Sequence, residues 1–427
     1  MNGKLTQLRH FLDRSHSVYH AVAELAQMLD NSGYTCLQET ENWELVPGGK
    51  YYLTRGGSAI VAFRVPNGQP NGFMISASHA DRPCFKVKEN GVLTGAYTRL
   101  AVERYGGMLI APWLDRPLGV AGRVLVETEK GIESRLVDFD RDLLLIPNVA
   151  IHMNRSANDG YKWNPATDTI PLLGNKEAAD KFWKELEELA GGKVLGHDLY
   201  LYVRQNASIW GMEEEFISSA AIDDLECAWA CTQGFLQAEQ TQNIPVLSVF
   251  DSEEVGSSSY QGAASDLMQS VLSRVCKALH LELSCQLAKS FLVSADNGHA
   301  LHPNHPEWAD SANAPLVNGG VVLKYNANQR YTTDGVSAAI FRKICAGADV
   351  PVQTYCNRAD IAGGSTLGNI SLSQVAVPSV DIGLAQLAMH SCYETAGVKD
   401  AQYLVDAMQA FYSTKLDRPA DGQFCLD

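Results

Sequence analysis

Apolar residues recur along this chain in two different rhythms. Residues 5–29 carry apolar side chains at helical spacing, and residues 50–65 alternate around Gly56 and Gly57, which predicts a helix followed by a β-hairpin. From about residue 216 onward, helical stretches alternate with strand-like ones. This order is typical of a parallel sheet with helices on its faces. We therefore predict an α/β fold built on a mixed, mostly parallel sheet.

The middle of the chain has a different pattern. Residues 107–151 are dense in short strand signals and contain no long helical stretch. One amphipathic helix is predicted at 176–189, before the glycine pair 191–192. The pattern predicts one α/β domain made of two separate parts and an inserted β-rich domain between them, with the boundaries 1–90, 91–212 and 213–427.

Composition narrows the choice of partners. The chain has 427 residues and a net charge of −15, which argues against nucleic acid or an anionic membrane as a partner. No apolar run has the length of a signal peptide core or of a membrane span, so we expect a cytoplasmic protein. The ten cysteines contain no Cys-x-x-Cys pair, and free thiols in a reducing compartment are the expectation.

Two strand-like runs end in residues that are common in catalytic sites. The apolar run at 248–250 leads to the adjacent acids Glu253 and Glu254, and the run at 72–78 leads to His79 and Asp81. Adjacent residues on a strand point in opposite directions, so one acid of the pair can bind a metal while the other faces a substrate. By themselves these patterns are weak, because a Glu-Glu pair is usually a solvated surface dipeptide.

Three further candidates, Asp223, Asp296 and His390, lie beside apolar segments downstream. Together with His79 and the paired acids they form an inventory of two imidazoles and several carboxylates. Two neighbouring divalent ions need one bridging carboxylate, terminal ligands on each side and a further carboxylate to take a proton from the bridging water. Ligands of this kind without thiolate suit zinc and also admit manganese or cobalt.

Several motifs, taken in their order along the chain, resemble those of the aspartyl aminopeptidase family of dinuclear zinc metallopeptidases. They include Ser-His-Ala-Asp-Arg-Pro at 78–83, Ala-Ile-Asp-Asp-Leu at 221–225 and Asp-Ser-Glu-Glu-Val-Gly-Ser at 251–257. The resemblance runs from Gly72 to beyond Gly397. Its other segments are 113–123, 147–152, 294–296, 299–304, 324–331, 363–366 and 388–391.

The resemblance implies a metallo-aminopeptidase-like catalytic domain and a set of roles. One metal would be held by His79, Asp223 and Asp296, and the other by Asp223, Glu254 and His390. Glu253 would be the general base and Asp81 would orient His79. The chain departs from the family's common pattern at Ala80, at Asp224 and at the pair Asn297 and Gly298; none of these changes removes a ligand.

The resemblance also implies the surroundings of the substrate. Lys324 would face an acidic substrate side chain, and His152 would enter the active site of a neighbouring subunit. Tyr331 either donates a hydrogen bond to the developing oxyanion or is a core aromatic residue. Backbone amides at 363–366, including that of Gly364, would line a substrate carboxylate. We interpret the histidines at 299, 302 and 305 as structural.

The function expected from these features is removal of N-terminal residues, preferentially Asp or Glu, from peptides by a water that bridges two metals. The insert would make subunit contacts, giving dimers and a dodecamer-like cage. Alternatives are an aminopeptidase of the same fold with a neutral preference, a dinuclear deacylase or carboxypeptidase, and a scaffolding protein with a vestigial site. The intact set of ligands and base argues against the last.

Overall fold

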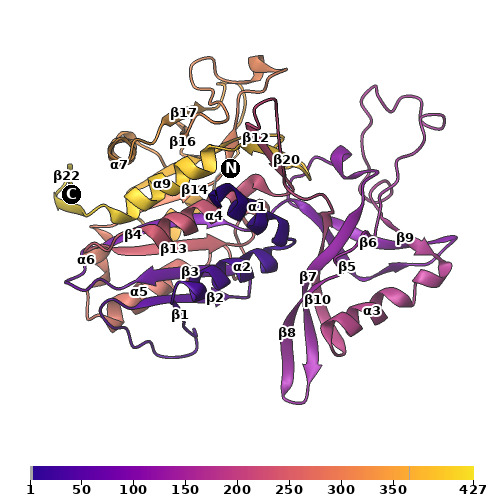
Figure 1. The fold of residues 1–427 in the computed structure, drawn as a ribbon, viewed down its shortest axis with the longest axis horizontal. Helices are drawn as coiled ribbons and strands as arrows, with labels where there is room; N and C mark the ends of the chain where they lie inside the picture. Colours follow the sequence, from indigo (N-terminus) through magenta and orange to yellow (C-terminus); the bar gives the residue numbers. More distant parts are fainter. Residues whose placement is uncertain (1–2, 365) are drawn as a thin grey trace.

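The computed structural model describes residues 3–364 and 366–427, and a nine-stranded mixed sheet is its centre (Figure 1). Five of its eight strand pairings are parallel, which confirms the predicted fold class. The strands, in their order across the sheet, are β1 (Thr35–Cys36), β2 (Lys50–Arg55), β3 (Ala59–Arg64), β13 (Ile244–Phe250), β4 (Phe73–His79), β14 (Phe291–Ala295), β18 (Ser379–Gly383), β16 (Val321–Tyr325) and β17 (Val352–Cys356).

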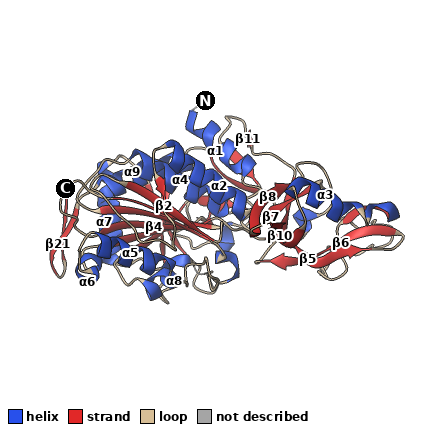
Figure 2. Cartoon of the chain, turned by 90° about the horizontal axis from the view of Figure 1, so that it is seen from below, coloured by secondary structure: helices blue, strands red, loops and turns tan. Residues whose placement is uncertain are grey.

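Helices cover both faces of this sheet (Figure 2). The central strands β13, β4 and β14 are buried along their whole length, as expected for strands covered on both sides. One face packs against α1 (Gly3–Arg14), α2 (Val18–Asn31), α4 (Ile222–Gln237), α7 (Gly335–Gly347) and α9 (Asp400–Ser413). The other packs against α5 (Leu267–Ala278), α6 (Leu283–Leu287) and α8 (Leu367–Gln374).

The chain opens with two helices, where the apolar spacing of residues 5–29 predicted one. The break falls at residues 15–17, because the Ser17 side chain accepts a hydrogen bond from the backbone N–H of His20 and so caps the start of α2. The hairpin of β2 and β3 around Gly56 and Gly57 is present as expected.

A second sheet of six antiparallel strands forms a separate lobe, at the right of Figure 1. Its strands lie between Cys84 and Val203, and the domain boundaries that we placed at 91 and 212 stay a prediction. In sheet order they are β8 (Gly131–Asp138), β7 (Leu118–Thr128), β10 (Val194–Val203), β5 (Cys84–Leu93), β6 (Tyr97–Tyr105) and β9 (Leu172–Asn175).

The helix expected at 176–189 begins later, as α3 (Lys181–Ala190), after a short 3-10 turn at Lys176–Ala178. Its buried residues Phe182, Leu186 and Ala190 are spaced four apart, so the apolar stripe that holds the helix on the sheet starts only at residue 182.

A five-stranded sheet of very short strands was not predicted. It contains β11 (Ser208–Trp210), β12 (Phe216–Ser219), β20 (Glu394–Gly397), β19 (Ala385–Leu387) and β15 (Gly298–His299), and a final hairpin joins β21 (Leu416–Ala420) to β22 (Gln423–Leu426). Across residues 3–364 and 366–427, none of the helices combines the length and the apolar character that a membrane span requires.

Candidate metal centre and active site

Three neighbouring parallel strands, β13, β4 and β14, end at the same edge of the central sheet. His79 is the last residue of β4, Asp296 follows β14, and the acid pair lies just after β13. Helix α4 begins beside them with Asp223 in its first turn. Ligand sites in open α/β sheets lie at this carboxyl edge, and the register of the strands brings these residues together from distant parts of the sequence.

The carboxylate of Asp223 lies between the two histidines. Its Oδ1 is 3.7 Å from Nε2 of His79, and its Oδ2 is 3.5 Å from Nε2 of His390. Nε2 of His79 is also 3.9 Å from Oδ1 of Asp296, and Nε2 of His390 is 3.3 Å from Oε2 of Glu254. The centre therefore consists of two groups of three residues that share one carboxylate.

Both imidazoles turn Nε2 toward this centre because Nδ1 is engaged elsewhere. Nδ1 of His390 donates to the carbonyl of Gly107 at 2.6 Å, and Nδ1 of His79 lies 3.2 Å from the carbonyl of Asp81. A carbonyl can only accept, so Nδ1 carries the proton of a neutral ring and Nε2 is left with a free lone pair. This is the usual arrangement of metal-binding histidines.

The charge of the centre fits a bound divalent cation. Burial raises the pKa of Glu253 to about 8, and it also raises the pKa of Glu254, with Asp223 adding to the shift. Oδ1 of Asp223 and Oε1 of Glu254 are buried without a hydrogen-bond partner among the described residues. Buried carboxylates this close together are costly unless a cation joins them. Ligand atoms within 4.8 Å of one another are found in two sets of three side chains: His79, Asp223 and Glu254, and Asp223, Asp224 and Asp296. These sets differ from the two groups above, because Glu254 is placed with His79 and Asp224 is added, but Asp223 is again the shared residue.

Asp81 connects the histidine side of the centre to the acid pair. Its Oδ1 accepts a hydrogen bond from the backbone N–H of Glu253, and its Oδ2 accepts one from that of Glu254, both at 3.1 Å. The same carboxylate lies 3.3 Å from Nδ1 of His79 and accepts a hydrogen bond from the Tyr105 hydroxyl at 2.7 Å. One buried side chain thus orients an imidazole and fixes the backbone of both acids.

Two buried acids at the centre had no assigned role in the sequence analysis. The Glu394 carboxylate accepts hydrogen bonds from the backbone N–H of Asp223 at 3.0 Å and of His390 at 2.7 Å. Asp224, which the sequence analysis marked only as a departure from the family's common pattern, accepts one from the backbone N–H of His79 at 3.1 Å. Neither acid has a sequence signal beyond its proximity to a candidate ligand.

Lys324 lies deep beside the centre, with only 2% of its surface exposed. Its Nζ donates to the carbonyl of Asn297 at 2.8 Å and lies 3.6 Å from Oδ2 of Asp296. The aromatic ring of Tyr331 is 5.6 Å from Nζ. A Cβ added to Gly383 would stand 1.9 Å from the carbonyl oxygen of Asp296 and 3.0 Å from Cε of Lys324, so this approach requires glycine.

A cavity of about 300 Å³ is lined by His299 and by residues 386–388, which lead to His390. Gly364 lies in its wall, whereas its motif neighbour Ser365 lies outside the described residues. The histidines that we interpreted as structural also line this cavity. It is large enough for part of a peptide substrate.

His152 is not brought to the centre of its own chain. It is exposed in the long connection between β8 and β9, and it forms no hydrogen bond or ion pair within residues 3–364 and 366–427. Its neighbours Val149, Ile151 and Met153 are exposed to 53%, 47% and 82%. These apolar side chains make the connection a candidate contact surface.

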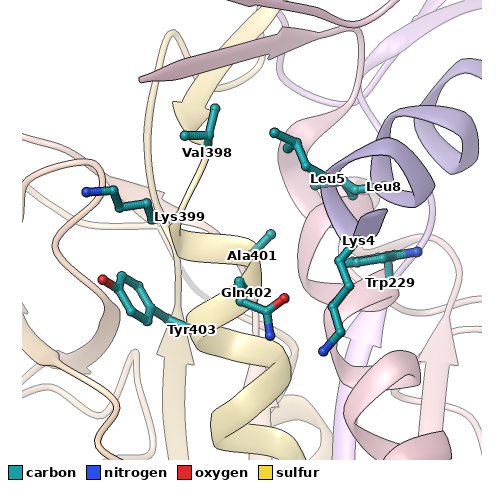
Figure 3. Close-up of a pocket in the computed structure, with 9 residues that line it drawn as sticks. All are labelled: Lys4, Leu5, Leu8, Trp229, Val398, Lys399, Ala401, Gln402 and Tyr403. Atoms are coloured by element: carbon teal, nitrogen blue, oxygen red, sulfur yellow. The ribbon is translucent and has the colours of Figure 1, made fainter. Parts of the chain in front are cut away.

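A second cavity, of about 280 Å³, lies between α1 and α9 (Figure 3). Its walls are mostly apolar and include Leu5, Leu8, Trp229 and Ala401. None of the candidate metal ligands lines it, so it is separate from the site described above.

Comparison with known proteins shows the family of this chain. Residues 11–412 match the family described as Aminopeptidase I zinc metalloprotease (M18). The chain is 41% identical over 425 residues to a probable M18 family aminopeptidase 2 of Clostridium novyi (strain NT), with 95% of this chain and 98% of that protein covered. It is also 41% identical over 428 residues to a probable M18 family aminopeptidase 2 of Pseudomonas paraeruginosa (strain DSM 24068 / PA7), with 97% and 99% covered.

Solved structures share the whole fold. The cryo-EM structure of the Ape4 and Nbr1 complex gives a TM-score of 0.92 at 34% identity and covers 96% of this chain and 85% of that chain. The structure of the S. cerevesiae mApe1 dodecamer gives a TM-score of 0.84 at 28% identity and covers 96% of both chains.

The fold and the converging imidazoles and carboxylates define the class of protein as a metallopeptidase. The chain belongs to the M18 family of zinc aminopeptidases, and the family resemblance found in its sequence is confirmed.

Proposed function

We propose that this aminopeptidase holds two divalent metal ions, with zinc as the preferred metal. We propose further that it releases N-terminal residues, preferentially Asp and Glu, from peptides. The observation that carries the two-metal proposal is Asp223, whose two oxygens face Nε2 of His79 and Nε2 of His390 at 3.7 and 3.5 Å. His79 and Asp296 would complete one site, and Glu254 and His390 the other. Cobalt or manganese would suit the same ligands.

When bound, the metal ions supply a Lewis acid that polarises the scissile carbonyl and lowers the pKa of water. Glu253 takes the proton of the attacking water and passes it to the leaving amine. Burial is the largest cause of the raised pKa of Glu253, and bound cations would lower that pKa again, so that the carboxylate would be ionised and able to accept a proton. The hydrogen bond from its backbone N–H to Asp81 keeps it in place.

The preference for acidic residues is assigned to Lys324. A buried ammonium is costly without anionic partners. One of its three donors is bound by the carbonyl of Asn297 at 2.8 Å, and Oδ2 of Asp296 lies 3.6 Å away, beyond the length of a hydrogen bond. We assign a remaining donor to a substrate carboxylate. We assign the Tyr331 hydroxyl to the oxyanion, because it makes no hydrogen bond to any residue that the structure describes.

A neutral preference remains the second candidate, and one observation favours it. Nζ of Lys324 lies 3.6 Å from Oδ2 of Asp296, so its charge is already compensated within the protein. Rates on a panel of peptides that begin with Asp, Glu, Ala or Leu decide between the two. Acetylated copies of the same peptides test the requirement for a free N-terminus, because a deacylase or carboxypeptidase would not need one.

We propose that the active protein is an assembly of dimers that build a dodecamer-like cage. A relative of known structure is the mApe1 dodecamer of S. cerevesiae. The exposed apolar residues around His152 support a subunit contact through the segment between β8 and β9, with His152 entering the active site of the neighbouring subunit. Light scattering of the purified protein tests the assembly. The cytoplasmic location stays a prediction.

A further inference from the structure

Asn297 is the residue that follows Asp296 at the end of β14, and its side chain is buried away from the cavity, with 2% of the residue exposed. Its amide makes three hydrogen bonds. Nδ2 donates to Oε2 of Glu226 at 3.2 Å and to the carbonyl of Leu384 at 3.4 Å, and Oδ1 accepts from the thiol of Cys227 at 3.2 Å. Both donors and the oxygen of this buried amide are engaged, so the side chain is held in one orientation.

These partners lie on different elements of the site. Glu226 and Cys227 belong to α4, the helix that carries Asp223, and Leu384 joins β18 to β19 ahead of His390. The side chain of Asn297 therefore ties the loop after β14 to two other segments that carry candidate ligands.

The backbone carbonyl of Asn297 contacts the cation of the site. It accepts a hydrogen bond from Nζ of Lys324 at 2.8 Å. The Lys324 side chain passes Gly298 and Gly383, where an added Cβ would stand 3.5 and 3.0 Å from its Cε. The ammonium is thus confined, and the carbonyl of Asn297 fixes the direction in which its remaining donors point.

We propose that Asn297 is a specificity-determining positioning residue. By anchoring its own carbonyl to α4 and to the β18–β19 segment, it sets the place of the Lys324 ammonium and thereby the discrimination between acidic and neutral N-terminal residues. This inference rests on the proposed role of Lys324. It adds to that role a second residue that touches neither substrate nor metal.

The test uses the zinc-loaded full-length protein and measures kcat and KM for peptides that begin with Asp and with Ala. Asn297→Leu keeps the size of the side chain and removes its three hydrogen bonds. We expect the ratio of kcat/KM for Asp over Ala to fall about tenfold, mainly through KM for the Asp peptide, while zinc content and turnover of the Ala peptide stay at the wild-type level.

Two matched variants separate positioning from general loosening of α4. In Glu226→Gln the new amide oxygen still accepts from Nδ2 of Asn297, so the ratio should be retained. Thr232→Val removes a hydrogen bond within the same helix, from Oγ1 to the carbonyl of Ala228, and should also leave the ratio unchanged. A loss of the ratio in Thr232→Val overturns the inference.

The outcomes for wild type and Lys324→Met distinguish the inference from the function on which it rests. If the wild type has no acidic preference, the proposed role of Lys324 fails and the inference fails with it. If Lys324→Met abolishes the preference but Asn297→Leu retains it with normal zinc content, only the inference is overturned. Should Asn297→Leu not fold, Cys227→Ala removes one of the three bonds and must lower the ratio about two- to threefold; an unchanged ratio overturns the inference.

Discussion

Oδ1 of Asp81 accepts a hydrogen bond from the backbone N–H of Glu253 at 3.1 Å. The same carboxylate accepts one from the backbone N–H of Glu254 and lies beside His79, so one side chain holds the backbone of both acids. Oε2 of Glu254 lies 3.3 Å from Nε2 of His390. In contrast, Glu253 is not part of either group of converging ligand atoms.

We predict that Glu253→Gln abolishes turnover and leaves metal content near normal, because the amide keeps the shape of the side chain but cannot accept a proton. Loss of a general base typically costs ~10²–10⁴-fold in rate. Glu254→Ala should lose metal instead. Elemental analysis and kcat of both variants provide the check, and equal loss of metal in the two would refute the division of tasks.

Glu394 should control metal affinity without touching a metal. In Glu394→Gln only one oxygen remains, so either Asp223 or His390 loses the acceptor of its backbone N–H. We expect zinc affinity to fall about 10–100-fold, as for other groups that orient metal ligands. Competition with a chromogenic chelator measures it. Thr395→Val, on the same strand but bonded to Ser218, is the matched control and should bind zinc like the wild type.

How much of the site could be predicted from the sequence depended on whether a local apolar pattern points to the residue. The candidate ligands His79 and Asp296 lie at the ends of strands that are buried throughout, which their apolar runs predict. Glu394 lies on a four-residue strand of the short-stranded sheet, and it binds a backbone N–H 171 residues away. No local pattern encodes such a contact, and the same is true of Asn297.

Subunit complementation tests the shared site. His152→Ala should lower activity at least about tenfold with no loss of metal. Glu253→Gln and His152→Ala subunits are dissociated, mixed in equal amounts and reassembled, so that half of the dimers contain one subunit of each kind. Such a mixed dimer has one intact site, with Glu253 from one subunit and His152 from the other. About a quarter of wild-type activity should therefore return. No recovery, or a fully active His152→Ala variant, would mean that His152 does not act across a subunit boundary.

The lobe of the second sheet is joined to the first domain through Asp198. Its Oδ2 accepts hydrogen bonds from Arg123 at 2.9 Å and from Tyr19 of α2 at 3.2 Å, and its Oδ1 accepts one from Lys86 at 2.7 Å. Burial raises the pKa of Asp198, but Lys86 and Arg123 outweigh it and hold the pKa below its usual value. Asp198→Asn should therefore lower the free energy of unfolding by about 1–2 kcal/mol at neutral pH.

The sign of the pH dependence follows from the lowered pKa. The stabilisation is complete above the unfolded value of about 3.9 and is lost as the pH falls through the lower folded value. Thermal unfolding of wild type and Asp198→Asn should thus differ at pH 7, and the difference should begin to shrink only as the pH falls below about 4. Asp140→Asn, at an exposed ion pair with Arg204, is the control and should change little. A difference that stays constant below about pH 4 would exclude ionisation of Asp198 as the cause.

The central claim is that Asp223 joins two metal sites into one catalytic centre. Zinc titration of the metal-free protein tests this claim most directly. Hydrolysis of a peptide that begins with Asp is measured as zinc is added in known equivalents per chain. The account predicts that full activity requires two equivalents in the wild type and that Asp223→Ala fails to retain either. Full activity at one equivalent, with no second ion bound at saturation, would contradict it.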